Sequence, residues 1–482
     1  MQVSCLPKLF SSAALLALPP ALVFGFDIPH PAVLSIFLSI VGLWVFEPIP
    51  LAATGLLVPV LAVLYGVTSA NVAFDAFGGD ILFLFLGCFL LGLALEKHGL
   101  DKRLAYFLLS RCMPGTSFLN INVMIAATTF VLSMWISNTS ATAIMTAITL
   151  GVLRCLEREV PEAAVRHAMS LRLLLGCAFA ASIGGLATPV GSPPNLIALK
   201  LLAQHGIVIS FGQWMAAALP VSLLMLAMML FIFHLYYPLP NLNFPRVKEE
   251  FARELTKLGP LKIAEKQVAV VFILVILLWI FAPLLPVLFP NSSALTALSE
   301  RLSMSVVALS GALILFFLPI SGHGSSNCNL HWSETAKVDW GTLLLFGGGL
   351  TLGALLEQSG AAKDVSAFIF AGPISSPLLV GSIVVGASIL LSEFSSNTAA
   401  ASILIPLILG ATLAQGMSTD ITTALVLAAT FGASFGFMFP VSTPPNAIVY
   451  GTGKVPALEM RKVGFLFDLA GASIIIVYVL IF

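Results

Sequence analysis

Residues 189–195 read Pro-Val-Gly-Ser-Pro-Pro-Asn, and residues 440–446 read Pro-Val-Ser-Thr-Pro-Pro-Asn, so that five of the seven positions are identical. A Ser-Asn-Thr triplet precedes each of these two proline strings, at 137–139 and at 396–398. All four strings lie inside strongly apolar stretches that would otherwise be continuous membrane helices. Helices interrupted at corresponding places in two halves of a chain are the best indication in a sequence of a transporter's binding site.

The composition is that of a membrane protein. Of the 482 residues, 59% are hydrophobic and only 9% are charged, whereas soluble domains carry about 25% charged residues. A soluble protein of this size could not bury so much apolar surface, so we expect a polytopic protein whose solvent is the lipid bilayer. The net charge is zero, which gives no reason to expect nucleic-acid binding.

The apolar segments predict an all-α protein with about eleven membrane spans and two re-entrant hairpins. They fall at about 9–26, 31–47, 51–66, 80–96, 120–152, 173–204, 213–236, 267–289, 303–320, 341–358, 377–415, 422–450 and 463–482. Most have about 20 residues, enough for one span. Segments 120–152 and 377–415 are longer and carry the triplets near their middles. We expect each to enter the membrane, turn at its triplet and leave on the same side.

The distribution of Lys and Arg supports this topology. With a cytoplasmic N-terminus, Lys8 and the inside loops hold 19 of the 22 basic residues; these loops are 97–119, 153–172, 237–266, 321–340 and 451–462. Only Lys200, Arg301 and Lys363 fall outside. Because cytoplasmic loops are rich in Lys and Arg, we expect the N-terminus in the cytoplasm and the C-terminus outside. The expected location is the inner (plasma) membrane of a bacterium.

The two halves of the chain repeat. Gly87, Gly92, Glu96 and Gly99 have counterparts in Gly348, Gly353, Glu357 and Gly360, each 261 residues later. Each repeat holds five spans and one hairpin, and an odd number of spans inverts the second copy in the membrane, as in many transporters. The predicted units are an extra first membrane helix (1–30), a first inverted repeat (31–240; hairpin about 117–152, broken helix about 173–204), a cytoplasmic connecting loop (241–266) and a second inverted repeat (267–482; hairpin about 377–415, broken helix about 422–450).

The four strings offer neutral oxygen ligands. Each triplet supplies two hydroxyls and an amide, and the prolines remove backbone N–H groups and so free carbonyls. Ser133 precedes Ser137 by four residues, and Ser392 precedes Ser396 by four, so on a helix each pair of hydroxyls faces one way. Such oxygens suit Na⁺. None of the four strings contains Lys or Arg, so a bound anion must rely on neutral donors, helix N-termini and co-bound cations.

Glu393 is the one acid inside a hairpin arm, and Met134 occupies the equivalent position in the first hairpin. An acid at membrane depth is a functional candidate by default. Glu393 could carry a proton, or it could brace the hairpin tip by accepting backbone hydrogen bonds, and we favour bracing. The histidines lie in loops or near span ends, and the sequence contains no catalytic constellation. We therefore expect neither a metal centre nor an enzyme.

These strings resemble the divalent anion/sodium symporter (DASS) family, which includes the INDY-like dicarboxylate transporters and their citrate and sulfate relatives. The likeness covers nearly the whole chain, including residues 47–52 (Glu-Pro-Ile-Pro-Leu-Ala) and 339–341 (Asp-Trp-Gly). The resemblance implies a homodimer held together by a scaffold of the first four spans and spans seven to nine. It also implies a mobile transport domain of the two hairpins and the remaining spans, which would slide across the membrane as an elevator.

The resemblance further implies which residues bind the cargo. For the substrate these are Ser137, Asn138, Thr139, Ser192, Pro193, Ser396, Asn397, Thr398, Thr443 and Pro444. The first sodium site would use Ser133, Ser137, Asn138 and the Gly191 carbonyl; the second would use Ser392, Asn397 and the carbonyls of Ser395 and Ser442. Ser392 stands where the family often has Thr, and Ser395 and Ser442 stand where it often has Ala. These departures keep the proposed ligand atoms.

We therefore expect a secondary active symporter that imports a C4-dicarboxylate such as succinate, malate or fumarate. Sodium is the expected coupling ion, with more than one ion per cycle, and no organic cofactor is expected. Three alternatives stay open: sodium-coupled transport of citrate or sulfate, sodium-independent dicarboxylate exchange, and a proton-coupled antiporter built on Glu393. No basic residue replaces a proposed sodium ligand, which favours a symporter over an exchanger.

Overall fold

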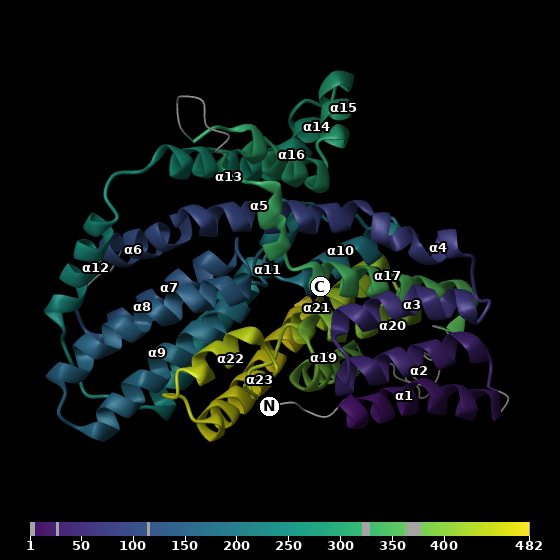
Figure 1. The fold of residues 1–482 in the computed structure, drawn as a ribbon, viewed down its shortest axis with the longest axis horizontal. Helices are drawn as coiled ribbons and strands as arrows, with labels where there is room; N and C mark the ends of the chain where they lie inside the picture. Colours follow the sequence, from purple (N-terminus) through teal and green to yellow (C-terminus); the bar gives the residue numbers. More distant parts are fainter. Residues whose placement is uncertain are drawn as a thin grey trace.

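The computed structural model describes residues 5–25, 28–112, 116–320, 328–361, 364 and 377–481. Over these residues the regular structure is helical, with two isolated β-bridges and no named strand. The first half holds α1 (Cys5–Gly25), α2 (Pro31–Phe46), α3 (Leu51–Leu64), α4 (Ala70–Phe74), the 3-10 helix η1 (Asp75–Gly78), α5 (Asp80–His98), α6 (Leu100–Cys112), α7 (Phe118–Ser133), α8 (Asn138–Glu159), α9 (Ala163–Gly184), α10 (Pro193–Gln204) and α11 (Phe211–Tyr236). Figure 1 shows how these helices pack around one another.

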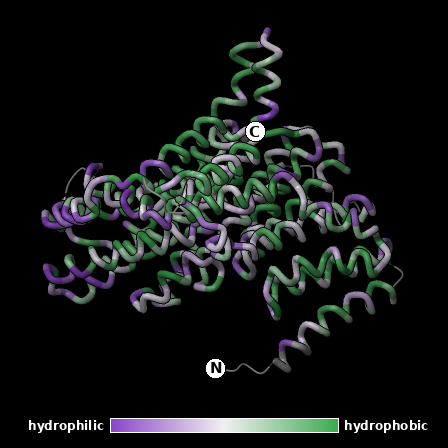
Figure 2. The backbone as a smooth tube through the Cα atoms, turned by 45° about the horizontal axis from the view of Figure 1, so that its top comes forward, coloured by the Kyte–Doolittle hydropathy of each residue, from purple (hydrophilic) through white to green (hydrophobic). Residues whose placement is uncertain are grey.

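The remainder of the chain begins with a connecting helix, α12. It holds α12 (Pro245–Lys257), α13 (Ile263–Phe281), η2 (Ala282–Leu284), α14 (Leu285–Leu288), α15 (Ser293–Arg301), α16 (Met304–Phe317), η3 (Trp332–Lys337), α17 (Trp340–Ser359), α19 (Pro377–Phe394), α20 (Asn397–Ala414), α21 (Thr419–Ala433), α22 (Pro444–Gly451) and α23 (Ala457–Ile481). Helices α14 and α15 project from the body at the top of Figure 1. Figure 2 shows hydrophobic residues running through the body and hydrophilic residues gathered at helix ends.

The predicted class, an all-α polytopic membrane protein, is confirmed. Among the described residues, seven helices are long and apolar enough to cross a membrane, or eight if the bent pair α15 and α16 is one span. Several other predicted spans contain shorter helices, such as α2 with 16 residues and α3 with 14. Residues 47–50 separate these two helices because prolines at 48 and 50 restrict the residue before each of them. An apolar run therefore locates a segment but does not give the length of its helix.

The two long apolar segments each fold into a pair of helices that meet at a triplet. In the first pair, α7 ends at Ser133 and α8 begins at Asn138; in the second, α19 ends at Phe394 and α20 begins at Asn397. The two helices of each pair contact each other. The side chains of Ser137 and Ser396 cap the following helices by accepting hydrogen bonds from backbone N–H groups three residues on, each at 3.1 Å. A serine in this position fixes where a helix begins.

The two proline strings interrupt the next helices. The break between α9 and α10 spans residues 185–192, and the break between α21 and α22 spans residues 434–443. Pro193 and Pro444 each take the first position of the helix that follows. Proline suits that position because its fixed φ matches a helix and its missing N–H would have no partner there.

Helix contacts recur when the two halves are exchanged. Helix α3 of the first half packs on α17 of the second half. Helix α16, the counterpart of α3, packs on α5, the counterpart of α17. Likewise α10 contacts α20 while α22 contacts α8. The hairpin of each half therefore lies against the broken helix of the other half, and this brings all four strings toward one region.

The predicted connecting loop, 241–266, contains a helix that the sequence interpretation missed. Helix α12 packs on α6 and buries only Val247 and Phe251, four residues apart on one face. Such a sparse apolar stripe is hidden among charged residues when a segment is judged by mean polarity. Behind it, Arg103 of α6 donates to Glu265 at 2.9 Å and to the carbonyl of Gly259 at 2.8 Å, which ties α6 to the start of α13.

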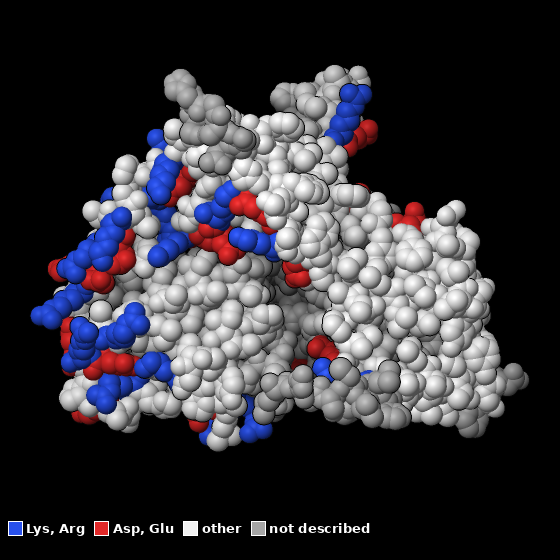
Figure 3. Space-filling view, in the orientation of Figure 1, with Lys and Arg blue, Asp and Glu red and all other residues white. Residues whose placement is uncertain are grey.

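Basic side chains gather at one end of the molecule. Figure 3 shows Lys and Arg concentrated toward the left of the view, where Figure 1 places α6, α12 and the adjacent ends of α8 and α9. We call this the basic end. Basic side chains also appear at the tip of the projecting α15, which ends at Arg301, and below the centre of the view.

Candidate functional site

The two triplets and the two proline strings line one cavity of about 730 Å³. All ten residues predicted to bind substrate lie on its wall: Ser137, Asn138, Thr139, Ser192, Pro193, Ser396, Asn397, Thr398, Thr443 and Pro444. Of the predicted sodium ligands, Gly191 and Ser442 also line it, whereas Ser133 and Ser392 are fully buried behind the tips. The fold thus brings together four strings that are up to about 300 residues apart in the chain.

Four helices begin at this cavity. The first residues of α8, α10, α20 and α22 are Asn138, Pro193, Asn397 and Pro444, and all four line the wall. A helix N-terminus carries unsatisfied backbone N–H groups and about half a positive charge. Four such ends around one cavity provide donors for an anion without any cationic side chain.

Behind the first tip, three oxygens converge around a single hydroxyl proton. Ser133 Oγ lies 2.6 Å from Asn138 Oδ1 and 2.7 Å from the carbonyl oxygen of Ala181. A serine hydroxyl has one proton, so it can donate to only one of these two acceptors. The Ala181 carbonyl also accepts the backbone N–H of Gly185 at 3.0 Å, which leaves the Ser133 proton for Asn138 Oδ1. The three oxygens form a neutral cluster of the kind that suits a small cation.

The second tip repeats the arrangement. Ser392 Oγ lies 2.8 Å from Asn397 Oδ1 and 2.7 Å from the carbonyl oxygen of Ala433. The serine, the amide and the carbonyl come from the same three places in the hairpin and the broken helix as in the first half. Each half therefore has its own cluster of neutral oxygens, of the kind that the sequence predicts for sodium.

The last residue of each proline string holds the break in shape. Asn195 Nδ2 donates to the carbonyls of Gly185 and Thr188, both at 2.8 Å. Asn446 Nδ2 donates to the carbonyls of Gly436 and Phe439, at 2.7 and 3.0 Å. Both asparagines are fully buried and neither lines the cavity. We did not predict this bracing role, although the identity of the residue in both strings was a signal for it.

We expect Asn195→Asp to destabilise the protein by about 3 kcal/mol or more, because a carboxylate cannot donate to the two buried carbonyls and would repel them. The melting temperature of the purified protein in detergent measures this loss. Asn241→Asp is the matched control because Asn241 is exposed. Equal melting temperatures for the two variants would contradict the bracing role.

A comparison with known proteins identifies the family. Residues 11–482 match the family model described as "Sodium:sulfate symporter transmembrane region". The chain belongs to this family. It is 35% identical to an uncharacterized transporter of Haemophilus influenzae over 447 residues, covering 92% of this chain and 89% of the relative. It is 32% identical over 462 residues to the sodium-dependent dicarboxylate transporter SdcS of Staphylococcus aureus, covering 94% of this chain and 86% of the relative.

Solved structures of two transporters share the fold of this sodium:sulfate symporter family member. The Alcanivorax borkumensis YdaH transporter aligns with a TM-score of 0.50 at 14% identity, covering 85% of this chain and 86% of that one. Neisseria gonorrhoeae MtrF aligns with a TM-score of 0.54 at 11% identity, covering 85% of this chain and 82% of that one. At such identities the likeness concerns the helical architecture. The chain is thus a sodium-coupled transporter by family and an all-helical membrane protein by fold.

Glu393 of this family member makes the bracing contacts that we favoured from the sequence. Its Oε1 accepts hydrogen bonds from the backbone N–H groups of Phe437 and Met438, at 2.6 and 2.9 Å, and its Oε2 accepts one from Ser442 Oγ at 2.9 Å. The carboxylate therefore joins the second hairpin to the break between α21 and α22. Ser395 Oγ donates to the carbonyl of Leu391, and the one proton of Ser442 Oγ is shared between the carbonyl and the carboxylate of Glu393. These bonds direct both hydroxyls away from the cavity.

Charged residues line the cavity away from the tips. The acidic ones are Glu47, Glu96, Asp101 and Asp339, and the only basic side chain on the described wall is that of Lys337. Glu96 lies near the end of α5, Asp101 lies at the start of α6, and Lys337 lies on η3, which is tied to the end of α5 by the Glu334–Lys97 ion pair. The cavity of this symporter family member therefore reaches from the hairpin tips toward the basic end.

Proposed function

We propose that this protein is a sodium-coupled symporter that imports C4-dicarboxylates such as succinate, malate and fumarate. The observation that carries the proposal is the pair of matching oxygen clusters behind two tips that share one cavity. In each cluster a serine hydroxyl lies within 2.8 Å of an asparagine side-chain oxygen and of a backbone carbonyl oxygen, and such a set of neutral oxygens suits a small cation. The name of the relative SdcS, a sodium-dependent dicarboxylate transporter, supports the choice of cargo.

In this proposal, sodium and the anion each lower the free energy needed to bury the other. The anion would meet the triplet amides and hydroxyls and the helix N-termini of α8 and α20. The first cation would bind at Ser133, Ser137, Asn138 and the Gly191 carbonyl, and the second at Ser392, Asn397 and the carbonyls of Ser395 and Ser442. Because no lysine or arginine belongs to the strings, an anion without the cations would be poorly compensated.

The proposed transport cycle is an elevator. The transport domain would contain the pairs α7 with α8 and α19 with α20, the broken helices α9 with α10 and α21 with α22, and α11 and α23. The scaffold would contain α1 to α5, α13, α16 and α17, and would form a homodimer in the membrane. The two halves would be inverted repeats, with the basic end in the cytoplasm of a bacterial cell and the C-terminus outside. The exchange of contacts between α3 and α17 and between α5 and α16 supports this pairing of halves.

Uptake of radiolabelled succinate into proteoliposomes tests the function. We expect uptake with an inward sodium gradient, and background uptake when potassium replaces sodium. Empty liposomes and an excess of unlabelled succinate are the controls. Uptake of citrate or sulfate but not succinate would show that the substrate is another anion, with the family assignment unchanged. Succinate uptake without sodium would indicate exchange or proton coupling.

Glu393→Gln separates sodium coupling from proton coupling. The amide oxygen can still accept hydrogen bonds at the break between α21 and α22, but the side chain can no longer release a proton. We therefore expect at least partial sodium-driven uptake by Glu393→Gln in the same liposomes. Complete loss of uptake, with the amount and melting temperature of the protein unchanged, would favour a proton-coupled mechanism.

A further inference from the structure

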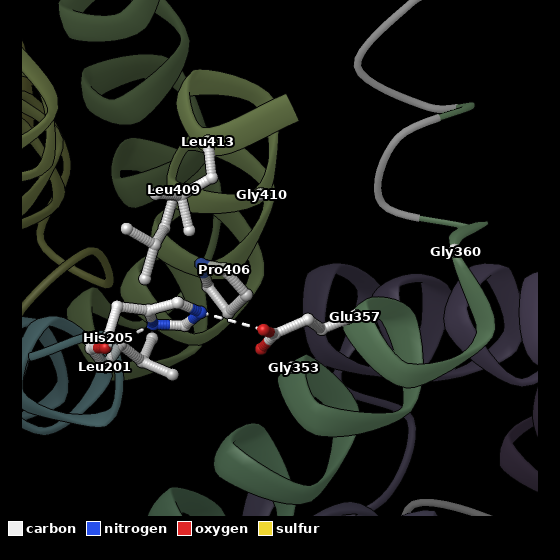
Figure 4. A pocket seen from close by; sticks show the side chains of 9 residues that line it. All are labelled: Leu201, His205, Gly353, Glu357, Gly360, Pro406, Leu409, Gly410 and Leu413. Atoms are coloured by element: carbon white, nitrogen blue, oxygen red, sulfur yellow. Dashed lines mark hydrogen bonds and ion pairs between the residues drawn. The ribbon is translucent and has the colours of Figure 1, made fainter. Parts of the chain in front are cut away.

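Two ion pairs cross from the end of α10 to helices that we assign to the scaffold. His205, directly after α10, lies with its Nε2 2.8 Å from Glu357 Oε1 at the end of α17. Lys200 on α10 lies with its Nζ 2.7 Å from Asp80 Oδ1 at the start of α5. Figure 4 shows His205 and Glu357 pointing toward each other across the gap between their helices. Both pairs lie away from the basic end, since α5 reaches that end only at its other terminus, near Lys97.

The geometry around His205 selects its charged form. Its Nδ1 lies 2.9 Å from the carbonyl oxygen of Leu201, and its Nε2 faces the Glu357 carboxylate. Both neighbours are acceptors, and a neutral imidazole has only one N–H to donate. Burial by itself would lower the pKa of His205, but the hydrogen bonds to Leu201 and Glu357 outweigh it, so the pKa lies above its ordinary value.

Other titratable groups near this contact are paired or distant. Helix α20, which packs on both α10 and α17, has no charged residue. Asp80 is taken by Lys200, and His30, just before α2, pairs with Asp364 at 3.4 Å. The remaining charged groups on elements packed against α10 and α17 are Asp75 at the start of η1, Asp420 in the first turn of α21, and Glu96, Lys97 and His98 at the far end of α5. Among the described residues, His205 is the only ion-pair partner of Glu357.

The boundary behind the ion pair is loosely filled. A cavity of about 240 Å³ lies between α10, α17 and α20, and Leu201, Pro406, Leu409 and Leu413 supply most of its apolar wall. Figure 4 shows these side chains beside the ring of His205. A gap in apolar packing forgoes dispersion contacts that would otherwise hold the helices together. The polar pairs are therefore a main attachment of α10 to α17 and α5 at this end.

We propose that His205 and Glu357 form a proton-operated lock that holds the transport domain against the scaffold while the binding cavity faces the basic end. The proposal rests on the elevator assignment of the proposed function. Lys200 and Asp80 form a second attachment that does not change over the same pH range. Sliding of the transport domain separates α10 from α17 and α5, so both pairs break in the opposite conformation.

The direction of the pH effect follows from the raised pKa of His205. Its contribution to the locked conformation is complete below the ordinary histidine value of about 6.5. It is lost as the pH rises through the raised pKa of the folded protein. Acid on the side of His205 therefore favours the conformation described here, and alkaline pH releases it.

Accessibility of the binding cavity tests the lock without requiring transport. Gly92 lines the cavity, and a β-carbon added there meets no atom within 4 Å. Gly92→Cys, labelled with a membrane-impermeant maleimide from the basic end and corrected for the parent protein, reports how often the cavity faces that end. We expect His205→Gln to slow this labelling at least about threefold at pH 6.5 and to leave it nearly unchanged at pH 8.5. Comparing the two proteins at one pH cancels the pH dependence of the maleimide itself.

Matched variants identify the cause. Glu357→Gln should behave like His205→Gln, and the double variant should be no slower than either, since all three lack the same contact. Lys200→Gln should slow labelling by the same factor at pH 6.5 and at pH 8.5, because neither Lys200 nor Asp80 titrates between these pH values. An effect of His205→Gln that is equal at both pH values, or additive with Glu357→Gln, would overturn the lock. If the labelling pattern is as expected but succinate is not taken up, the proposed substrate is wrong and the lock is still supported.

Discussion

We expect Asn138→Ala and Asn397→Ala each to lower sodium-driven uptake about 100-fold or more. Each amide lies on the cavity wall, and its oxygen also belongs to the cluster around Ser133 or Ser392. Alanine therefore removes a proposed substrate contact and a proposed cation ligand in one step. Losing both contacts reduces the binding free energy by about 3 kcal/mol, which corresponds to roughly two orders of magnitude in affinity. Initial rates of succinate uptake over a range of sodium concentrations measure the effect.

Asn120→Ala is the control for these two variants, because Asn120 lies near the start of α7, the other arm of the hairpin in which Asn138 begins α8, and outside the cavity wall. Its uptake should match that of the unmodified protein. Equal loss in all three variants would show a general sensitivity of the hairpins to substitution. Uptake by Asn138→Ala or Asn397→Ala at the unmodified rate would remove the triplets from the site.

The second large effect is expected for Gly185→Ala. A β-carbon at Gly185 would lie 2.5 Å from Asn138 Oδ1, and no real side chain approaches so closely without displacement. Gly185 has a φ of −60°, so the strain comes from space alone and not from backbone conformation. The methyl group must push the Asn138 amide out of the first oxygen cluster. We expect uptake to fall as far as it does in Asn138→Ala, with a strong rise in the sodium concentration needed for half-maximal rate.

Two glycines calibrate this prediction. Gly436, the equivalent residue in the second half, would place a β-carbon 3.5 Å from Asn397 Oδ1 but 2.8 Å from Thr443 Cγ2. Gly436→Ala should therefore disturb that amide much less and displace the Thr443 side chain instead. Gly151 lies in α8 with only a distant arginine atom, 3.8 Å away, near its added β-carbon. Gly151→Ala should leave uptake unchanged and can add up to about 1 kcal/mol of stability, as alanine does in helices. A Gly185→Ala protein as active as Gly151→Ala would show that the tip tolerates the displacement.

Local signals in the sequence were enough to place the hairpins and the broken helices. Proline at 193 and 444 stops one helix and starts another whatever the surroundings, and serine at 137 and 396 caps the helix that follows. The repetition of these signals in both halves then indicated that the four strings belong together. The structure shows all four around one cavity.

Contacts between distant residues could not be predicted in the same way. His205 and Glu357 are 152 residues apart, and each alone resembles an ordinary polar residue at a helix end. The role of Asn195 depends on two carbonyls that lie within its reach only because the preceding helix is broken in this particular shape. Helix α12 was missed because its stability comes from packing on α6, which mean polarity does not reveal.

The absence of cationic side chains from the four strings has a consequence for the response to membrane voltage. Moving one elementary charge through 100 mV changes the free energy by about 2.3 kcal/mol. The four strings contribute no positive charge of their own, so two sodium ions and one dianion, which sum to zero, leave the charge of the transport domain unchanged on loading. A third sodium ion would make the loaded step carry one positive charge more than the return step. The current measured during uptake therefore counts the sodium ions beyond two.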